Sequence, residues 1–423
     1  MHGGFSMDIW HIFGGERLRG SLRVQGSKNA SLPILAAAIL APQRCELLRV
    51  PRLTDVEAAL CILRRLGCTA AWQDDTFCID TTTLSSCAIP PELMAEMRSS
   101  VIFMGALLAR CGEAQLSLPG GCKLGKRPID LHLKALRSLG AEITEAGGAL
   151  FCRASKLTGA VIALPFPSVG ATENAMLAAC GARGESVIRG AAREPEIVAL
   201  QGFLRAMGCE IEGAGTGTIR IGGLRSPGFV RYAIPADRIA AATFGCAVLG
   251  CGGDIELRGV ESQQISAVLH FLNAAGCDII TNKASLRLRA SGRPLPVGTV
   301  VTAPYPGFPT DAQPLLMAAL LRARGRSLLR ETIFEERFRQ VPELCRLGAQ
   351  ITVEGQTAEI IGVERLHGDT LHATDLRGGA SMILATLSAE GESLVLDEGH
   401  VRRGYEDFDA ALESLGAHIV LEH

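Results

Sequence analysis

Six helices rich in Ala, Leu and Met recur along the chain, and each is apolar on nearly all sides. They begin in the stretches KNASLPILAAAIL, MRSSVIFMGALLA, SVGATENAMLAAC, DRIAAATFGCAVL, TDAQPLLMAALLR and DLRGGASMILATL. Helices of this kind are buried rather than solvent-facing. A short apolar strand is predicted after each one, in ELLRV, QLSLP, SVIRG, DIELRG, SLLRE and SLVLD.

A second helix in each copy ends in a glycine signature that precedes another strand. The six copies are LRRLGCTAAW, LRSLGAEITE, LRAMGCEIEG, LNAAGCDIIT, LCRLGAQITV and LESLGAHIVL. Their glycines are Gly67, Gly140, Gly208, Gly276, Gly348 and Gly416, spaced by 73, 68, 68, 72 and 68 residues. Each glycine fits a helix C-cap, where a left-handed backbone costs least without a Cβ. The pattern predicts six repeats of about 70 residues.

The sixth repeat stops after LGAHIVLEH, without the two strands that follow every other signature. The missing strands are predicted at the N-terminus, in DIWHIFGG and RLRGSLRVQG. We therefore infer that residues 1–27 complete the sixth repeat. The fold class is α/β (α+β), with three repeats in each of two lobes. The lobes are predicted at residues 28–236 and at residues 237–423 plus 1–27.

Composition and charge narrow the class of protein. The 423 residues are 48% hydrophobic, and their net charge of −2 gives no reason to expect a nucleic acid or a membrane as partner. The 14 cysteines form no C-x-x-C pair, and H-E-x-x-H is absent. No membrane span and no signal peptide are expected. We expect a cytoplasmic enzyme with reduced thiols, without disulfides or a metal site.

Polar residues stand at the start of each buried helix, where unpaired N–H groups and a positive dipole end favour anions. They are Lys28, Asn29, Arg98, Ser168, Asp237, Arg238, Asp311, Asp375 and Arg377. Asp237 and Asp375 are interpreted as N-caps. Lysine and arginine are poor caps, which favours a binding role for Lys28, Arg98 and Arg377. If each lobe presents these ends on one face, two such faces across a cleft would bind anions.

A glycine-rich connection, LPGGCKLGKRPID at residues 118–130, is longer than its counterparts. Lys123, Lys126 and Arg127 would favour the thiolate of Cys122 in this loop. From its residues alone, Cys122 is as compatible with an incidental thiol as with a reactive one. The other thirteen cysteines are expected to be buried or incidental. Lone arginines in loops, including Arg337, Arg402 and Arg403, are usually solvated, and the histidines show no constellation.

Several motifs together resemble one family. GSKNASLPILAAAIL, LPGGCKLGKRPIDLH, SVGATEN, AAREPEI, FPTDAQ, RFRQVPEL, ATDLR and RRGYE occur in this order along the whole chain. The set resembles the UDP-N-acetylglucosamine 1-carboxyvinyltransferases, which are enolpyruvyl transferases. The resemblance implies two lobes, each an inside-out α/β barrel of three βαβαββ repeats with pseudo-threefold symmetry. It also implies enolpyruvyl transfer from phosphoenolpyruvate to UDP-N-acetylglucosamine in the bacterial cytoplasm, without metal or organic cofactor. This is the first committed step of peptidoglycan synthesis.

The resemblance also implies residue roles. Cys122 matches the proton donor, and Asp311 matches the acid beside the sugar 3′-hydroxyl, with Lys28 and Arg403 also assigned to catalysis. The matching substrate-binding residues are Lys28, Asn29, Arg98, Arg127, Pro128, Ile129, Asp130, Leu131, Ser168, Val169, Gly170, Asp311, Ile333, Arg337, Asp375, Arg377 and Arg403. Phe166 replaces a lysine that some members carry, so a diphosphate contact from that position is in doubt.

Two alternatives stay open at this point. A 5-enolpyruvylshikimate-3-phosphate synthase resembles the chain in fold, although its family lacks the cysteine loop. A non-catalytic protein that binds UDP-sugars is the second alternative. The sequence does not indicate an oligomeric state, and a monomer is compatible with it.

Overall fold

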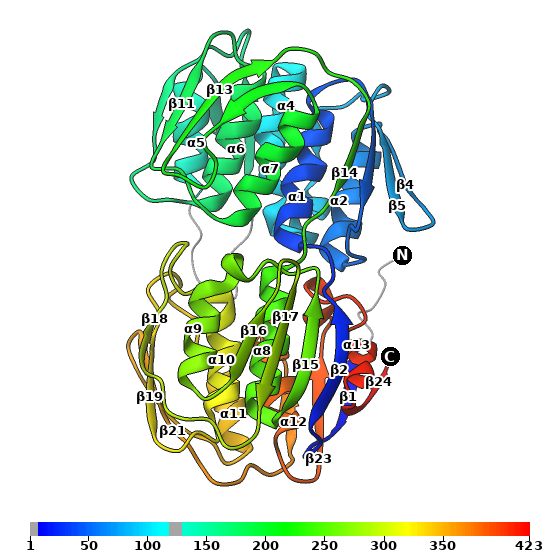
Figure 1. Ribbon diagram of the computed structural model, residues 1–423. Helices are drawn as coiled ribbons and strands as arrows, with labels where there is room; N and C mark the ends of the chain where they lie inside the picture. Colours follow the sequence, from blue (N-terminus) through cyan, green and yellow to red (C-terminus); the bar gives the residue numbers. More distant parts are fainter. Residues whose placement is uncertain (1–6, 118–128) are drawn as a thin grey trace. The chain divides into compact units, whose positions relative to one another are not determined.

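A computed structural model describes residues 7–117 and 129–423, apart from the side chains of Glu96 and Arg98. The described chain divides into two compact units, which are coloured along the sequence in Figure 1. The first unit consists of residues 26–117 and 129–235. The second unit consists of residues 7–25 and 236–423. The N-terminal segment therefore belongs to the same unit as the C-terminal half of the chain.

Twelve strands of the described chain lie in each unit. Those of the first unit are β3 (Arg44–Leu48), β4 (Thr69–Gln73), β5 (Thr76–Asp80), β6 (Ala88–Ile89), β7 (Glu113–Ser117), β8 (Glu142–Ala146), β9 (Ala149–Arg153), β10 (Val161–Ala163), β11 (Ser186–Arg189), β12 (Cys209–Glu212), β13 (Thr218–Leu224) and β14 (Val230–Ala233). Those of the second unit are β1 (Asp8–Phe13), β2 (Leu18–Arg23), β15 (Gly253–Arg258), β16 (Asp278–Thr281), β17 (Ser285–Ala290), β18 (Gly298–Val301), β19 (Arg326–Arg330), β20 (Gln350–Glu354), β21 (Thr357–Ile361), β22 (Thr370–His372), β23 (Glu392–Asp397) and β24 (His418–Glu422).

These strands form six four-stranded sheets within the described residues, three in each unit. In the first unit the orders are β14-β3-β5-β4, β6-β7-β9-β8 and β10-β11-β13-β12. In the second unit they are β2-β15-β17-β16, β18-β19-β21-β20 and β22-β23-β1-β24. The first pair of every sheet is parallel and the other two pairs are antiparallel. The repetition seen in the sequence is thus also a repetition of sheet topology.

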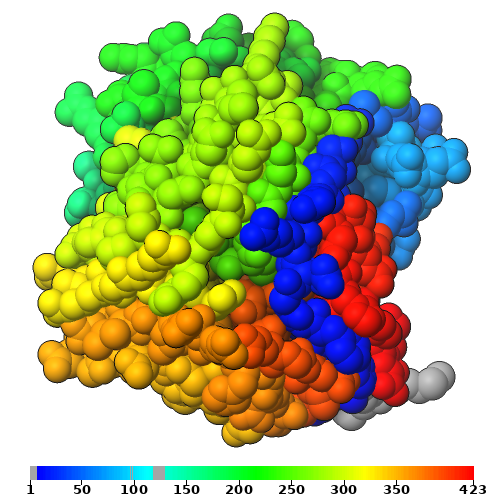
Figure 2. All heavy atoms as spheres, turned by 60° about the horizontal axis from the view of Figure 1, so that its bottom comes forward, coloured from blue at the N-terminus to red at the C-terminus, as the bar shows by residue number. Residues whose placement is uncertain are grey.

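The last strand of each repeat joins the sheet of the next repeat. β6 pairs with β7 and β10 with β11, and β14 returns to β3, which closes the first unit. In the second unit β18 pairs with β19, β22 with β23, and β2 with β15. β1 lies between β23 and β24. β1 and β2 therefore supply the two strands that follow the sixth glycine signature, but they lie in two different sheets. Figure 2 shows this N-terminal segment, in blue, beside the red C-terminal residues.

The helices fall into two groups. The apolar ones are α1 (Lys28–Ala37), α4 (Phe103–Cys111), α6 (Val169–Cys180), α8 (Arg238–Cys251), α10 (Gln313–Leu320) and α12 (Leu376–Leu387). The second helices of the repeats are α2 (Thr54–Arg65), α5 (Asp130–Ser138), α7 (Pro195–Ala206), α9 (Ser266–Ala274), α11 (Val341–Arg346) and α13 (Phe408–Ser414). Shorter segments are α3 (Pro91–Glu96), η1 (Ala38–Leu40), η2 (Arg98–Ile102), η3 (Ser262–Ile265), η4 (Thr310–Ala312) and η5 (Val401–Arg403).

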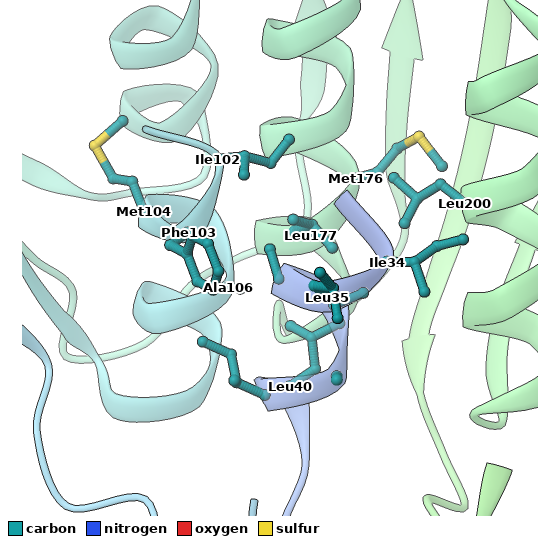
Figure 3. Packing of buried hydrophobic residues seen from close by; sticks show 14 of the residues in the cluster. Ile34, Leu35, Leu40, Ile102, Phe103, Met104, Ala106, Met176, Leu177 and Leu200 are labelled. Carbon is teal, nitrogen blue, oxygen red and sulfur yellow. The ribbon is translucent and has the colours of Figure 1, made fainter. Parts of the chain in front are cut away.

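The apolar helices form the interior of each unit, as their sequence predicts. In the first unit α4 packs on both α1 and α6, and in the second unit α8, α10 and α12 pack on one another. Figure 3 shows Ile34 and Leu35 of α1 near Met176 and Leu177 of α6 and Phe103 of α4. These five side chains have almost no solvent exposure. Burial of one such side chain contributes about 1.5–3 kcal/mol, so the interior helices hold each unit together.

The six signature glycines all adopt the left-handed backbone. Their φ angles lie between +88° and +96°. This confirms the helix C-caps predicted from the repeat, because only glycine reaches these angles without strain. The GAGTGT stretch at residues 213–218 joins β12 to β13 as a turn.

Thirteen cysteines lie in the part of the chain that the structure describes, and none of them forms a disulfide there. Seven are buried, five are intermediate, and Cys61 is exposed. Within the same residues, no helix is long and apolar enough to cross a membrane.

Candidate active site

A buried ion pair lies at the start of α1. Lys28 is the first residue of this helix, and the N-cap before it is Ser27, whose Oγ accepts a hydrogen bond from the Ala30 N–H. The Nζ atom of Lys28 lies 2.6 Å from Oδ2 of Asp55, in the first turn of α2. The helix dipole disfavours a cation at this end. The carboxylate of Asp55 offsets that cost and keeps Lys28 charged beside half-buried Asn29.

Asn174 of α6 connects three elements of the first unit. Its Oδ1 accepts from the Gly105 N–H at 2.7 Å, and its Nδ2 donates to the Val101 carbonyl at 2.9 Å. The same Nδ2 lies 2.8 Å from Nδ1 of His132, on α5. Because the amide nitrogen can only donate, Nδ1 of His132 is the acceptor. The imidazole is therefore neutral and carries its proton on Nε2.

Burial keeps this imidazole neutral. His132 is 8% exposed, and burial lowers its pKa to about 4, although the charge of Asp130 acts in the opposite direction. The ring lies against the first turn of α6, because a Cβ placed on Gly170 would come within 2.9 Å of the His132 Cε1 atom. Glycine at position 170 is thus needed for this close approach.

The first turn of α6 also offers backbone donors. Ser168 is the N-cap, and its Oγ accepts from the Ala171 N–H at 3.4 Å. Val169 and Gly170 are the next residues, and both are half-buried. N–H groups of a first helical turn have no acceptor within the helix, which suits them to an anion. Phe166, two residues before the cap, is 46% exposed.

In the second unit, two buried arginines hold one carboxylate. Nη2 of Arg337 donates to Oδ1 of Asp311 at 2.8 Å, and Nε and Nη2 of Arg377 both donate to Oδ2 at 3.2 Å. The arginine side chains are 2% and 3% exposed, whereas that of Asp311 is 30% exposed. Charge-assisted bonds of this kind are the strongest that side chains make. Asp311 is therefore fixed in one orientation with part of its carboxylate open to solvent.

Further residues hold this arrangement in place. Asp375 is the N-cap of α12, and its Oδ1 accepts from the N–H groups of Arg377 and Gly378 at 3.0 Å. The guanidinium of Arg377 lies 5.3 Å from the ring centroid of Tyr405, whose hydroxyl lies 2.8 Å from Oγ1 of Thr243. Burial raises the pKa of Tyr405, so its hydroxyl stays protonated.

Buried Glu331 fixes the loop that contains Ile333. Its Oε1 accepts from the N–H groups of Ile333 and Phe334 at 2.8 and 3.1 Å, and its Oε2 accepts from Oγ1 of Thr310 at 3.0 Å. Thr310 directly precedes Asp311. This carboxylate therefore connects the Ile333 loop to the segment that presents Asp311.

Comparison with known proteins identifies the family. The profile of the family described as EPSP synthase (3-phosphoshikimate 1-carboxyvinyltransferase) matches residues 12–412. The chain belongs to the enolpyruvyl transferase family. Two curated relatives illustrate the similarity. UDP-N-acetylglucosamine 1-carboxyvinyltransferase of Maricaulis maris is 46% identical over 416 residues, which are 98% of each chain. UDP-N-acetylglucosamine 1-carboxyvinyltransferase 2 of Caldanaerobacter subterraneus subsp. tengcongensis is 44% identical over 414 residues, 98% of this chain and 99% of the relative.

Solved structures agree with the two-unit fold of this enolpyruvyl transferase. The enolpyruvyl transferase NikO from Streptomyces tendae has a TM-score of 0.88 and 26% identity, and the match covers 98% of this chain and 99% of that one. An EPSP synthase from Acinetobacter baumannii has a TM-score of 0.77 and 19% identity over 98% of this chain and 100% of that chain. The similarity to this EPSP synthase shows a shared fold and nothing further. The predicted α/β class with two lobes of three repeats is confirmed.

The structure places the predicted site residues in two groups. Lys28, Asn29, Asp130, Leu131, Ser168, Val169 and Gly170 lie in the first unit, as do Ile129 and the backbone of Arg98, which begins η2. Asp311, Ile333, Arg337, Asp375, Arg377 and half-buried Arg403 lie in the second unit. Cys122, Arg127 and Pro128 lie outside the described residues, as do Lys123 and Lys126.

For Arg337 the expectation of a solvated loop arginine was wrong, since its guanidinium is buried against Thr310 and Asp311. For Arg402 the expectation holds in part, because it is 43% exposed and its Nε lies 2.7 Å from Oδ2 of Asp8. Among the described residues, no group of three or more His, Cys, Asp or Glu side chains could hold a metal ion.

Four residues of the site had no role in the sequence analysis: Asp55, His132, Asn174 and Glu331. His132 ends the quoted stretch RPIDLH, so its place in that motif was a usable signal. Asn174 ends the quoted motif SVGATEN, which was a signal of the same kind. Asp55 had none, because an acid in a first helical turn is an ordinary feature.

Proposed function

We propose that this enolpyruvyl transferase transfers the enolpyruvyl group of phosphoenolpyruvate to the 3′-hydroxyl of UDP-N-acetylglucosamine and releases phosphate. The observation that carries the proposal is the similarity, over 98% of the chain, to relatives named for this reaction. In bacteria the product enters peptidoglycan synthesis. The enzyme would act in the cytoplasm on two small-molecule substrates, without a nucleic acid or membrane partner.

The chemistry divides into an addition and an elimination. Cys122 gives a proton to the methylene carbon of phosphoenolpyruvate, which makes the adjacent carbon electrophilic. Asp311 takes the proton of the sugar 3′-hydroxyl, and the oxygen attacks that carbon to form a tetrahedral adduct. The new methyl group then loses a proton, phosphate leaves with its bonding electrons, and the carbon–carbon double bond returns. Side chains can carry each proton, so the reaction is proposed to need no metal or organic cofactor.

The geometry of Asp311 supports its role as base. A general base must present a carboxylate in a fixed orientation while remaining accessible to its substrate. Arg337 and Arg377 provide the orientation, and the 30% exposure of the Asp311 side chain provides the access. Asp375 would support the site through its cap on α12 rather than by contact with the substrate.

The anionic groups of the substrates require cationic and N–H partners. Phosphoenolpyruvate carries close to three negative charges, and we propose that Lys28, Arg98, Arg127, Arg337 and Arg403 neutralise them. The charge that Asp55 maintains on buried Lys28 supports this assignment.

We propose that the UDP-sugar binds beside the first turns of α5 and α6. Ile129, Asp130 and Leu131 would contact the nucleotide from α5. The N–H groups of Val169 and Gly170 would donate to the diphosphate. The Nε2–H of neutral His132, held by Asn174 beside Gly170, adds a further donor at the same place. These donors would compensate for the lysine that Phe166 replaces.

A phosphate-release assay tests the proposal. Phosphoenolpyruvate would be supplied with UDP-N-acetylglucosamine, with shikimate 3-phosphate, or alone. We expect release only in the first mixture. Release only with shikimate 3-phosphate would support the alternative that the family profile names. Calorimetric binding of UDP-N-acetylglucosamine without any phosphate release would mean a non-catalytic UDP-sugar-binding protein.

A further inference from the structure

Two buried cysteines of the first unit lie in sulfur–sulfur contact. Cys180 is the last residue of α6, and Cys209 is the first residue of β12. Their Sγ atoms are 3.2 Å apart, and the two residues are 2% and 5% exposed. The proposed transfer reaction uses neither thiol.

The two thiols differ in acidity. The hydrogen bond from Cys180 lowers the pKa of Cys209, whereas burial and the charge of Glu210 act in the opposite direction without reversing the shift. The same hydrogen bond, together with burial, raises the pKa of Cys180 well above its usual value. A thiolate is the reactive form of cysteine. We therefore take Cys209 as the nucleophile of the pair and Cys180 as the thiol that keeps its proton.

A pocket gives small molecules a route to this pair. It has a volume of about 250 Å³ and is lined by Cys180, Leu224 and Arg225 among others. Cys209 does not line the pocket itself, but its strand partner Leu224 does, and its Sγ lies 3.2 Å from that of Cys180, so the pocket reaches the pair at Cys180. A water molecule occupies about 30 Å³ in the liquid, and a molecule of hydrogen peroxide is only slightly larger.

We propose that Cys180 and Cys209 form a peroxide-sensitive thiol pair that closes reversibly to a disulfide. The Cys209 thiolate attacks one oxygen of a hydroperoxide, the O–O bond breaks, and hydroxide leaves, so that Cys209 becomes a sulfenic acid. The Cys180 sulfur then attacks the Cys209 sulfur. The S–O bond breaks, water leaves, and an S–S bond forms. In total, two thiols lose two electrons and two protons, and hydrogen peroxide becomes two water molecules. A dithiol reductant reverses the oxidation.

Bond formation requires little movement at this place. A disulfide has an S–S length of about 2.05 Å, so the sulfurs need to approach by about 1 Å. The bond would close the chain over a sequence separation of 29 residues, which spans β11 and α7. It would tie the C-terminal end of α6 to β12, whereas Ser168, Val169 and Gly170 lie at the other end of this helix. Oxidation should therefore stabilise the unit.

Peptide mapping of the full chain tests the proposal. The reduced protein is treated with hydrogen peroxide, its remaining thiols are alkylated, and it is digested with trypsin without a reductant. Cys180 lies in the peptide 157–183 and Cys209 in the peptide 206–220, and neither peptide contains another cysteine. We expect these peptides to appear linked, at about 2 Da below their summed masses. Dithiothreitol should release them.

Internal and variant controls sharpen the result. Cys246 and Cys277 are buried in the second unit and close enough to influence each other's charge, but they show no sulfur–sulfur hydrogen bond. Their peptides, 239–258, which also contains Cys251, and 259–283, should stay unlinked. In Cys180→Ala, Cys209 should be trapped as a sulfenic acid by dimedone. The oxidised wild type should melt at least about 3 °C higher than the reduced protein, and Cys209→Ser should show no such shift.

Two results would overturn the proposal. One is the recovery of peptides 157–183 and 206–220 with both thiols alkylated after peroxide treatment that oxidises other cysteines of the chain. The other is equal linkage of the Cys246 and Cys277 peptides, which would mean unselective oxidation.

Discussion

The ammonium group of Lys28 lies 2.6 Å from the carboxylate of Asp55, and both side chains are almost fully buried. The lysine stands at a helix N-terminus, where the dipole repels it. In the proposed function this charge neutralises the anionic substrate, so Asp55 would have a task that a surface ion pair does not have. Asp55 stabilises the cationic side chain of Lys28 at a position where the helix dipole disfavours a positive charge.

Replacing Asp55 therefore removes the carboxylate that compensates the buried charge of Lys28, and the folded chain becomes less stable. We expect Asp55→Asn to lower the free energy of unfolding by about 3–5 kcal/mol, because the neutral amide no longer compensates Lys28. Urea unfolding at neutral pH measures this. The matched control is Glu185→Gln, which removes the exposed partner of Arg220 and should change stability by no more than about 1 kcal/mol. Equal effects of the two substitutions would contradict the assignment.

Turnover should fall even when Arg337 is replaced by a residue of the same charge. In Arg337→Lys the planar fork that contacts Thr310 and Asp311 is lost, so Asp311 keeps only its bonds to Arg377 and is held less firmly. We expect kcat to fall by about 10²-fold, while the Kd for UDP-N-acetylglucosamine changes only a few-fold. Steady-state kinetics with calorimetry measures both quantities.

Arg339→Lys is the control for that experiment, since the Arg339 side chain is 40% exposed. It should leave kcat unchanged. If Arg337→Lys behaved in the same way, the fork would not be what orients Asp311.

The neutral state of His132 predicts a pH dependence of stability. Its pKa is about 4 in the folded chain and 6.5 in the unfolded chain, so between these values only the unfolded chain takes up the proton. Stability from this group is fully present above pH 6.5 and falls with falling pH, by about 3 kcal/mol in total at pH 4. His132→Gln retains a polar amide but does not titrate. Unfolding curves between pH 4 and 7 should be less pH-dependent for this variant, and equal slopes would disprove a buried neutral imidazole.

Two signature glycines with the same backbone angle differ in their surroundings. Gly208 has φ +88°, and a Cβ there would lie 2.5 Å from the Ser226 carbonyl oxygen. Gly416 has φ +89°, and its nearest atom would be 3.8 Å away. Gly416→Ala should cost about 1–2 kcal/mol from backbone strain alone, and Gly208→Ala should cost clearly more. Chemical denaturation of both variants would measure the difference, and equal costs would mean that the carbonyl moves away freely.

The repeat period made most of the fold predictable. A glycine that must be left-handed and a helix that must be buried are both dictated by local chemistry, and each occurs six times in the sequence. The pairing of β2 with β15 was not predictable in this way. A repeat in sequence says which elements follow one another, but not which strand lies beside which. That depends on the closure of three repeats into one unit.

Residues of the candidate site could be predicted only where their type is unfavourable for the helix position that they occupy. Lys28 and Arg377 stand out because they are unfavourable at a helix N-terminus. Asp55 and Glu331 do not stand out, since their importance comes from partners that are distant in sequence, such as Lys28 and Thr310. Arg337 was misjudged for the same reason, because its acceptors lie 26 and 27 residues away.

The proposed role of Cys122 can be tested by substitution and by alkylation. Cys122→Ser should lose most turnover, because a hydroxyl is a far weaker acid than a thiol, whereas UDP-N-acetylglucosamine binding should stay within a few-fold. An epoxide phosphonate such as fosfomycin should alkylate this thiol. Mass spectrometry that located the label on another cysteine would refute the role of Cys122, as would an equal loss of turnover and binding in the variant.

The most direct test of the addition and elimination is the reaction of both substrates in deuterated water. If the methylene carbon is protonated and later loses a proton, the vinyl group of the product must contain deuterium, with one phosphate released for each product molecule. Mass spectrometry and proton NMR of the purified product measure both quantities. A product that forms with stoichiometric phosphate but without deuterium in its vinyl group would contradict the mechanism.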